Sequence, residues 1–328
     1  MESKRNLLNH FKLLQQGVAR LGGEALLNVK TFFVDITIAN KTHKLYPQFF
    51  VLQEGKPLYS HQFVPNALVF SGWRPYFRTV VPEVGQKLKF KEVVVRHGLL
   101  TPEYSRDGKI DGPVIIKKNI SSFGDEIRGP FKSSAGQKID VDAGQYFERF
   151  IPGEIAKIWF WNMTPVVVET KTMYQILGDG RTTIKELVVK KVFNKKKQPN
   201  WNRLEELLAF YGRNFDTVLA QGETQIVDFR YTSEFSWPRE VNETVLPTDD
   251  KTFDPLGLAG QVIWDTLDVE TRKACVFTID AILDADKKWW LLECNFNPFV
   301  HPGVYPLMLA SLVQEHSQPP QALATNMH

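Results

Sequence analysis

Three oxygen-bearing side chains near the C-terminal end of the chain have the types and the spacing that suit a divalent cation. They are Asp280, Glu293 and Asn295, and they lie in or directly after two apolar runs, Phe277–Leu283 and Trp289–Cys294, which flank a polar stretch. This pattern predicts a β-hairpin. A plain surface hairpin with scattered acids is the alternative, but the second run is too apolar for a fully solvated strand.

The position of the hairpin turn decides which side chains meet. If the turn centres on Asp286 and Lys287, residues whose numbers sum to about 573 face each other. Asp280 then lies opposite Glu293, and Asn295 shares their face because it is two residues further along the strand. Carboxylate and amide oxygens are ligands that Mg²⁺ accepts beside water and nucleotide phosphates. The hairpin is therefore a candidate magnesium site.

A second candidate element is a short strand that ends in lysine. Gly112 precedes the run Pro113–Lys117, and a polar loop with Ser121 and Ser122 follows and ends at Gly124. Backbone amides and hydroxyls of such a loop can donate to phosphate oxygens, while a lysine places a positive charge beside them.

Further along, the extended run Tyr146–Ile151 meets the turn Pro152–Gly153. An extended segment of this kind can hydrogen-bond an adenine along its backbone, although an ordinary strand end is the alternative.

Composition narrows the class of protein. The chain has 328 residues, 43% of them hydrophobic, and a formal charge of +3, so it can bury a core and offers no general case for nucleic acid. Its two cysteines do not form a disulfide framework, and no run reaches the roughly 20 apolar residues of a membrane span. We expect a cytoplasmic protein with no membrane partner, and the sequence leaves a homodimer open.

The order of elements predicts a mixed class, α/β or α+β. A helix and apolar runs occupy the first 85 or so residues, and a helical pattern over Lys87–His97 ends at Gly98. Strand-like runs then dominate to Lys171, and helices are predicted at 182–190, 201–211 and 304–316.

Taken in order, these pieces resemble the ATP-grasp superfamily between residues 87 and about 303. The run Gly178–Leu187 is similar to the ATP-grasp region of cyanophycin synthetases, and the spacing of Asp280, Glu293 and Asn295 is similar to that of D-alanine:D-alanine ligases. The resemblance implies an ATP-grasp fold with an N-terminal mixed α/β lobe at 1–86, which is a candidate substrate-binding lobe. The ATP-grasp domain would span 87–328, with a small antiparallel lid at about 100–150 and a C-terminal metal-binding lobe at about 151–328.

The resemblance also implies roles for individual residues. ATP and Mg²⁺ would be the cofactors, and Asp280, Glu293 and Asn295 would hold the metal. Nucleotide contacts would come from Lys87, Lys117, Ser121, Ser122, Glu148, Arg149, Phe150, Ile151 and Glu154, with Glu148 at the adenine side and Glu154 at the ribose. Lys171 would lie near the transferred phosphate, and Arg230 is our second candidate catalytic residue.

Several residues depart from the family pattern or leave a choice open. Lys118 stands where the family has proline, so either Lys117 or Lys118 can face the phosphates, but strand alternation allows only one of them. The loop 121–124 has few glycines, and Phe299 replaces a glycine common in dipeptide ligases.

Other polar residues have two possible roles each. Arg74 and Arg78 are candidates for a substrate carboxylate or are surface arginines, and His301 is catalytic or structural. Arg230 and Arg239, with Glu234 between them, lie in a loop-like stretch before the hairpin, and either arginine can line the acceptor side.

The function implied is an ATP-dependent carboxylate–amine ligase that joins small-molecule substrates, amino acids or a peptide, through an acyl phosphate. Two alternatives remain from the sequence. One is a phosphotransferase that acts on a hydroxyl, and the other is a catalytically silent nucleotide-binding subunit.

Overall fold

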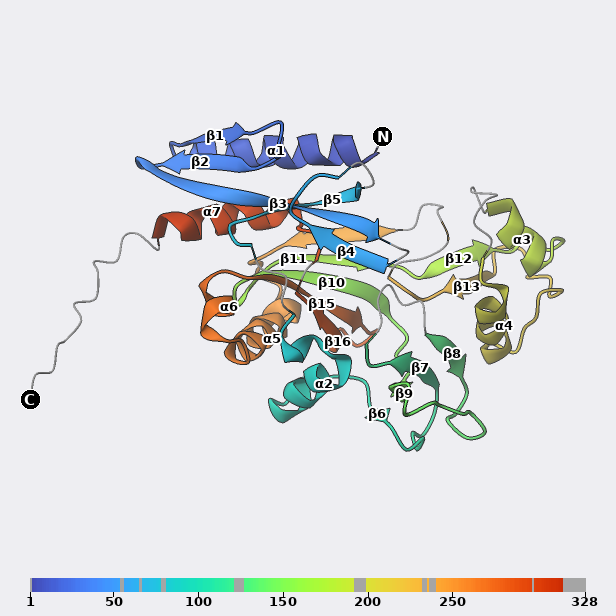
Figure 1. Ribbon diagram of the computed structural model, residues 1–328. Coiled ribbons are helices and arrows are strands. Elements are labelled where there is room, and N and C mark those ends of the chain that lie inside the picture. Colours follow the sequence, from blue (N-terminus) through green and yellow to red (C-terminus); the bar gives the residue numbers. More distant parts are fainter. Residues whose placement is uncertain are drawn as a thin grey trace, which may run out of the picture.

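The computed structural model describes residues 2–53, 56–64, 67–77, 81–120, 127–191, 199–231, 235, 240–296 and 298–314 (Figure 1). The strands form four sheets, and every described strand pair is antiparallel. The mixed α/β class predicted from the sequence is confirmed, in its α+β form. Among the described residues, no helix is both long and apolar enough to cross a membrane.

The N-terminal sheet has the order β1-β2-β3-β4, and β5 pairs with β3. Its strands are β1 (Glu24–Leu27), β2 (Val34–Ile38), β3 (Lys41–Gln53), β4 (Lys56–Ser60) and β5 (Ala67–Arg74), and helix α1 (Glu2–Arg20) precedes them. Helix α1 packs against this sheet through Leu14 and Val18, which are fully buried. The C-terminal helix α7 (Tyr305–Gln314) belongs to the same hydrophobic core, together with Trp161 and Val276 of the central sheet. The first 86 residues therefore share their core with the end of the chain.

The central sheet has the order β14-β11-β10-β15-β16. These strands are β14 (Val241–Val245), β11 (Thr164–Lys171), β10 (Glu154–Trp161), β15 (Val276–Leu283) and β16 (Trp289–Asn295). Helices α2 (Lys87–Arg96), α5 (Asp254–Asp265) and α6 (Val269–Lys273) lie on the side of the sheet away from the N-terminal sheet (Figure 1). Alternation along the strands sends apolar side chains such as Ile158 and Ile279 to this covered face. The other face is covered in part by the core shared with the N-terminal sheet, through Trp161 and Val276, and carries polar groups further along, at Lys157 and Asp280.

A small sheet of order β6-β9-β7-β8 lies where the lid was expected. Its strands are β6 (Tyr104–Ser105), β7 (Val114–Lys118), β8 (Arg128–Phe131) and β9 (Gln145–Arg149), and they enclose a core of their own around Val114, Ile116 and Phe147.

A further unit projects from the central sheet and was not anticipated within the expected C-terminal lobe (Figure 1). Strands β12 (Tyr174–Leu177) and β13 (Thr224–Asp228) pack with helices α3 (Ile184–Lys191) and α4 (Trp201–Phe210) around a separate core. Helix α3 starts at a capping box, in which the Glu186 N–H donates to Thr183 Oγ1 at 3.3 Å and the Thr183 N–H donates to Glu186 Oε2 at 3.0 Å.

The predicted helices agree with the structure to within three residues at each end. Helix α2 ends just before Gly98, whose φ of +71° favours glycine. Helix α5 had not been predicted. The remaining short helices are 3₁₀ turns: η1 (Glu83–Gly85), η2 (Lys251–Phe253) and η3 (Pro302–Val304).

Candidate functional site

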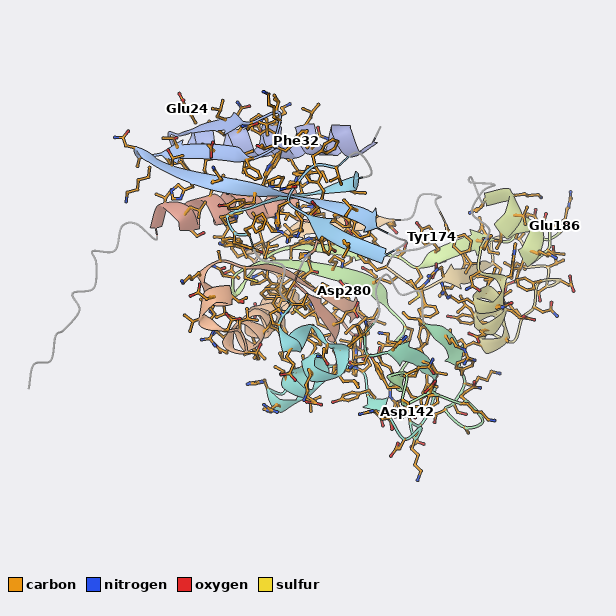
Figure 2. All side chains as sticks on the ribbon, in the orientation of Figure 1. Glu24, Phe32, Asp142, Tyr174, Glu186 and Asp280 are labelled. Carbon is orange, nitrogen blue, oxygen red and sulfur yellow. The ribbon has the colours of Figure 1, made fainter. Side chains whose placement is uncertain are left out.

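The open face of the central sheet forms the floor of a cavity of about 350 Å³. Figure 2 places Asp280 on this sheet, in the middle of the molecule. Because residues two apart on a strand share a face, the strand pairing arranges the floor in rows. One row is apolar, with Ile155 paired to Ile282. The next is ionic, with Lys157, Asp280 and Glu293 side by side. The third consists of Trp159, Thr278 and Asn295.

The predicted pairing of Asp280 with Glu293 is confirmed, and the turn includes Asp286 and Lys287 as predicted, but the pairing next to the turn differs. Leu283 pairs with Trp289, one residue out of the predicted register, and the register shifts by one between Asp280 and Ala281. This β-bulge leaves Leu292 without a partner, so that Leu292 and Glu293 both line the cavity. Without the bulge, Leu292 would lie on the covered face, because Glu293 pairs with Asp280 and successive side chains alternate.

Each carboxylate of the ionic row has a lysine partner. Lys157 Nζ lies 2.6 Å from Asp280 Oδ1, and Lys87 Nζ lies 2.9 Å from Glu293 Oε2. Burial raises the pKa of Asp280, and the neighbouring Glu293 carboxylate adds to the effect against the opposing pull of Lys157. Burial would also raise the pKa of Glu293, but Lys87 and Lys117 hold it below its ordinary value. A divalent cation bound at Asp280 and Glu293 would therefore meet at least one ionised carboxylate, that of Glu293.

The donor set fits Mg²⁺ in its chemistry, because carboxylate and amide oxygens are ligands that this ion accepts. Asp280 Oδ1 is buried, and its partner in the structure is the Lys157 ammonium at 2.6 Å. Asn295 Nδ2 lies 3.4 Å from Asp280 Oδ2, so the amide is next to the carboxylate. Within the described part of the chain, no group of three or more His, Cys, Asp or Glu side chains is placed to hold a metal. Two carboxylates and an amide would leave room for water and phosphate, as Mg²⁺ prefers.

Of the two candidate lysines on strand β7, Lys117 faces the site. Lys117 is buried and lines the cavity, whereas Lys118 is partly exposed on the opposite face. Lys117 Nζ donates to Glu148 Oε1 at 2.8 Å, and Lys91 Nζ lies 2.9 Å from Glu148 Oε2. Burial would raise the pKa of Glu148, yet Lys117 and Lys91 together lower it. Burial lowers the pKa of Lys91 to about 8 in spite of Glu148.

This buried triad changes the expected role of Glu148. The sequence placed Glu148 beside the adenine, but its carboxylate is held between two lysines and a tyrosine, Tyr146, whose hydroxyl donates to Glu148 Oε2 at 3.4 Å.

The backbone of the expected hinge is also partly used. The Arg149 N–H donates to the Glu103 carbonyl at 2.8 Å, and the Phe150 N–H donates to the Pro113 carbonyl at 2.9 Å. Two of the three backbone N–H groups expected to meet a base are thus already hydrogen-bonded to carbonyls at the small sheet of β6, β9, β7 and β8. Phe150 and Ile151 still line the apolar end of the cavity, whereas Glu154 is not among the lining residues.

Of the two candidate catalytic residues, Arg230 lies in the cavity wall, whereas Lys171 is not among the lining residues but contacts one of them, Tyr231. Arg230 is buried, lines the cavity and makes a two-point contact with Asp228, at 3.0 Å from Nε and 2.9 Å from Nη2. Lys171 pairs with Glu169 and lies over the Tyr231 ring, 4.1 Å from its centroid. Lys157 lies over the same ring at 4.7 Å. Tyr231 lines the cavity and joins the two lysines.

The remaining candidate residues from the sequence lie in different parts of the structure. Arg74 is buried, not a surface arginine, and its Nη2 donates to the Pro298 carbonyl at 2.5 Å. His301 lies 3.1 Å from Glu243 and accepts the Gly303 N–H, so it caps η3 and is not among the residues that line the cavity. Ser121, Ser122 and the rest of the loop 121–124, with Arg78, Glu234 and Arg239, lie outside the described residues.

Sequence reasoning missed Lys91, Lys157 and Thr278. Lys157 and Thr278 could have been found by alternation, because each has the parity of a cavity-facing residue on its strand: Lys157 lies two residues from Ile155 and Thr278 two from Asp280. The Gly178–Leu187 run, by contrast, belongs to the projecting unit, and no residue of it is among those that line the cavity.

No protein-family model matches the sequence, and no curated protein matches it. The solved structures that the chain resembles include a glutathione synthetase, a D-alanine–D-alanine ligase and an ATP-grasp ligase. One is the bifunctional glutathione synthetase of Pasteurella multocida, with 15% identity and a TM-score of 0.44 over 92% of this chain and 44% of that one. Another is the D-alanine–D-alanine ligase of Bacillus anthracis, with 10% identity and a TM-score of 0.40 over 70% and 66%.

A third is the ATP-grasp ligase PsnB complexed with a minimal precursor, with 13% identity and a TM-score of 0.38 over 70% and 61%. The chain thus spans between 44% and 66% of the lengths of these proteins. Identities this low do not identify substrates, so the function proposed below depends on the side chains of the site.

Proposed function

We propose that the protein is an ATP-dependent ligase that joins a carboxylate to an amine. The observation that carries this proposal is the ionic row of the cavity floor, Lys157, Asp280 and Glu293, with Lys87 and Lys117 beside it. An apolar row on one side and a polar row on the other give the cavity two ends of different chemistry.

The apolar end suits a nucleotide base. Ile115, Ile155, Met173, Phe229 and Ile282 line it and belong to one hydrophobic cluster. A planar base buried among such side chains is stabilised by the apolar area that it covers.

The ionic row suits the phosphates. Four lysines, Lys87, Lys91, Lys117 and Lys157, pair with three carboxylates in and beside the row, so this whole set of groups has one positive charge in excess. In a partly buried site this charge attracts an anion more strongly than it would in water. Burial would lower the pKa of Lys117, but Glu148 and Glu293 raise it, which keeps this lysine charged beside a phosphate.

In the reaction, a substrate carboxylate oxygen attacks the terminal phosphorus of ATP, and the bond to ADP breaks. The amine then attacks the acyl carbon, phosphate leaves, and the nitrogen loses a proton. Lys87, Lys117 and Lys157 would offset the negative charge that spreads during phosphoryl transfer, and no side-chain nucleophile is needed. Mg²⁺ held by Asp280, Glu293 and Asn295 would supply charge neutralisation at the phosphates.

The proposal is tested by product analysis. ADP release should require a carboxylate substrate, hydroxylamine should trap the activated acyl group as a hydroxamate, and the product mass should equal acid plus amine minus water. A product that is only a phosphorylated hydroxyl would contradict the ligase proposal and favour the phosphotransferase. Absence of any ATP turnover, with nucleotide still bound, would favour the silent subunit.

A further inference from the structure

Two residues of the third row of the cavity floor, Trp159 and Thr278, have no part in binding ATP or Mg²⁺ under the proposed function. Trp159, Thr278 and Asn295 lie side by side across three strands, one row beyond Asp280 and on the side away from Ile282. Rows two residues apart are separated by roughly 6.6 Å along a strand. If the base covers Ile282 and the phosphates cover the ionic row, the group that meets the terminal phosphate lies over Thr278.

Thr278 itself is built to meet a ligand. Its side chain is fully buried, it lines the cavity, and Oγ1 has no hydrogen-bond partner in the part of the chain that the structure describes. A buried hydroxyl without a partner is destabilising, so such groups are rare unless a ligand or water satisfies them. The hydroxyl can both donate and accept, which suits a carboxylate, an acyl phosphate or an amine.

The walls around Thr278 are aromatic. Trp159, Tyr59 and Phe299 all line this part of the cavity, and the Trp159 Nε1–H donates to the Phe299 carbonyl at 2.8 Å, which fixes the segment after Pro298. Phe50 contacts Tyr59 edge-on at 5.8 Å and Phe299 at 6.3 Å between ring centroids. The aromatic wall therefore joins the N-terminal sheet to the end of the metal hairpin.

Two of these rings are only half covered by the protein. Tyr59 is 37% exposed and Phe299 is 42% exposed, although both contribute to the cavity. A ligand that covers them gains apolar burial and ring contacts. The acids that line the cavity, Glu148, Asp280 and Glu293, each have a lysine partner away from this wall. The wall thus favours an apolar group over a basic one.

We propose that the second substrate binds over Thr278, with its polar group hydrogen-bonded to Oγ1 and an aromatic or bulky apolar group against Tyr59 and Phe299. This inference rests on the proposed function and names the substrate class for the same site. The N-terminal sheet, through Tyr59, is then part of the specificity wall.

The test measures ADP release in the presence of ATP, Mg²⁺ and one member of a substrate panel. The panel consists of six amino acids, which are glycine, alanine, glutamate, lysine, phenylalanine and tyrosine, and of the amide of each. The aromatic members should have KM values at least tenfold below those of the alanine members. In Tyr59→Ala and Phe299→Ala, the KM of the aromatic members should rise about tenfold, while the KM of ATP stays constant. Thr278→Val, which keeps the shape of the side chain, should lower kcat/KM of the second substrate about tenfold.

Phe63→Ala is the matched control, because Phe63 is 50% exposed on the same N-terminal lobe but packs against Phe32 and Phe49 and is not among the lining residues. Equal KM values for aromatic and small members, or no effect of Tyr59→Ala, would overturn the inference. Calorimetry with a non-hydrolysable ATP analogue separates the two levels. If the analogue binds but only the small panel members stimulate ADP release, the inferred substrate class is wrong and the proposed ligase function is unaffected. If the analogue does not bind, the proposed function itself fails.

Discussion

At the scale of single residues, the two carboxylates of the ionic row differ in what surrounds them. Glu293 is paired with Lys87 and held ionised, whereas burial works against the charge on Asp280. Glu293 should therefore be the stronger electrostatic ligand for a divalent cation.

Glu293→Gln should abolish most metal-dependent turnover while the fold survives. The amide keeps the shape but not the charge, so ADP formation should fall at least about 100-fold, or roughly 3 kcal/mol of transition-state stabilisation. The measurements are ADP formation and Mn²⁺ binding, with a thermal melt to follow folding. Asp286→Asn, on the exposed turn of the same hairpin, is the control and should leave both unchanged. Wild-type turnover in Glu293→Gln would refute the metal assignment.

Lys91 gives a prediction about pH. Its pKa is lowered by burial to about 8, below the ordinary value of 10.5 that it regains on unfolding. Between pH 8 and pH 10.5 the unfolded chain binds more protons than the folded protein. The free energy of unfolding therefore increases as the pH rises. Relative to Lys91→Met, which cannot titrate, the wild-type protein should gain up to about 3 kcal/mol between pH 8 and pH 10.5.

Urea unfolding of both proteins at pH 7, 8, 9 and 10 measures this difference, because the other titrating groups are common to both. Glu148 keeps Lys117 as a partner in the variant, which protects it from being left as a buried unpaired charge. Parallel stability curves across this range would show that Lys91 titrates normally.

At the scale of elements, strand β7 decides which lysine serves the site. Lys117 lines the cavity and Lys118 lies on the other face, since successive side chains of a strand alternate. Lys117→Ala should lower ATP turnover at least tenfold, and Lys118→Ala should not. Steady-state kinetics on the two variants is the measurement, and the reverse order of effects would mean that the register of β7 is off by one residue.

The hairpin of β15 and β16 shows a second effect at this scale. Its bulge places Leu292 and Glu293 on the same side, so the apolar row and the ionic row of the floor both reach strand β16. One extra residue thus keeps the Glu293 carboxylate at the cavity while the core residues Leu291 and Cys294 both stay on the covered face.

At the scale of the whole molecule, the N-terminal sheet is part of one core with the C-terminal helix. Trp161, Val167 and Val276 of the central sheet are buried in the same cluster as Leu14 and Phe70. Removal of residues 1–86 would expose this apolar surface, so the fragment 87–328 should fail to fold cooperatively. Circular dichroism melts of the fragment and the full chain test this. A fragment that melts like the full chain would show that the lobe is independent.

Local chemistry was sufficient to predict much of the site from the sequence. Two apolar runs around a polar turn predicted the hairpin, and alternation along its strands grouped Asp280 with Glu293 and Asn295. The helix over Lys87–Arg96 was also predicted, since a helical stripe and a glycine stop are local signals. The metal and nucleotide roles of these residues remain predictions.

Only the tertiary structure decided which strands are neighbours. Lys157 and Thr278 belong to β10 and β15, and nothing near either residue in the chain indicates that these strands pair. Tyr59 reaches the cavity only because the N-terminal sheet folds back onto the central sheet.

The same limit applied to Glu148, which the sequence placed beside a base and the fold placed between Lys91 and Lys117. Side-chain parity follows from the geometry of one strand and can be found in the sequence. Partners across strands depend on how the whole chain buries its apolar surface, and that is settled only when the sheets pack together.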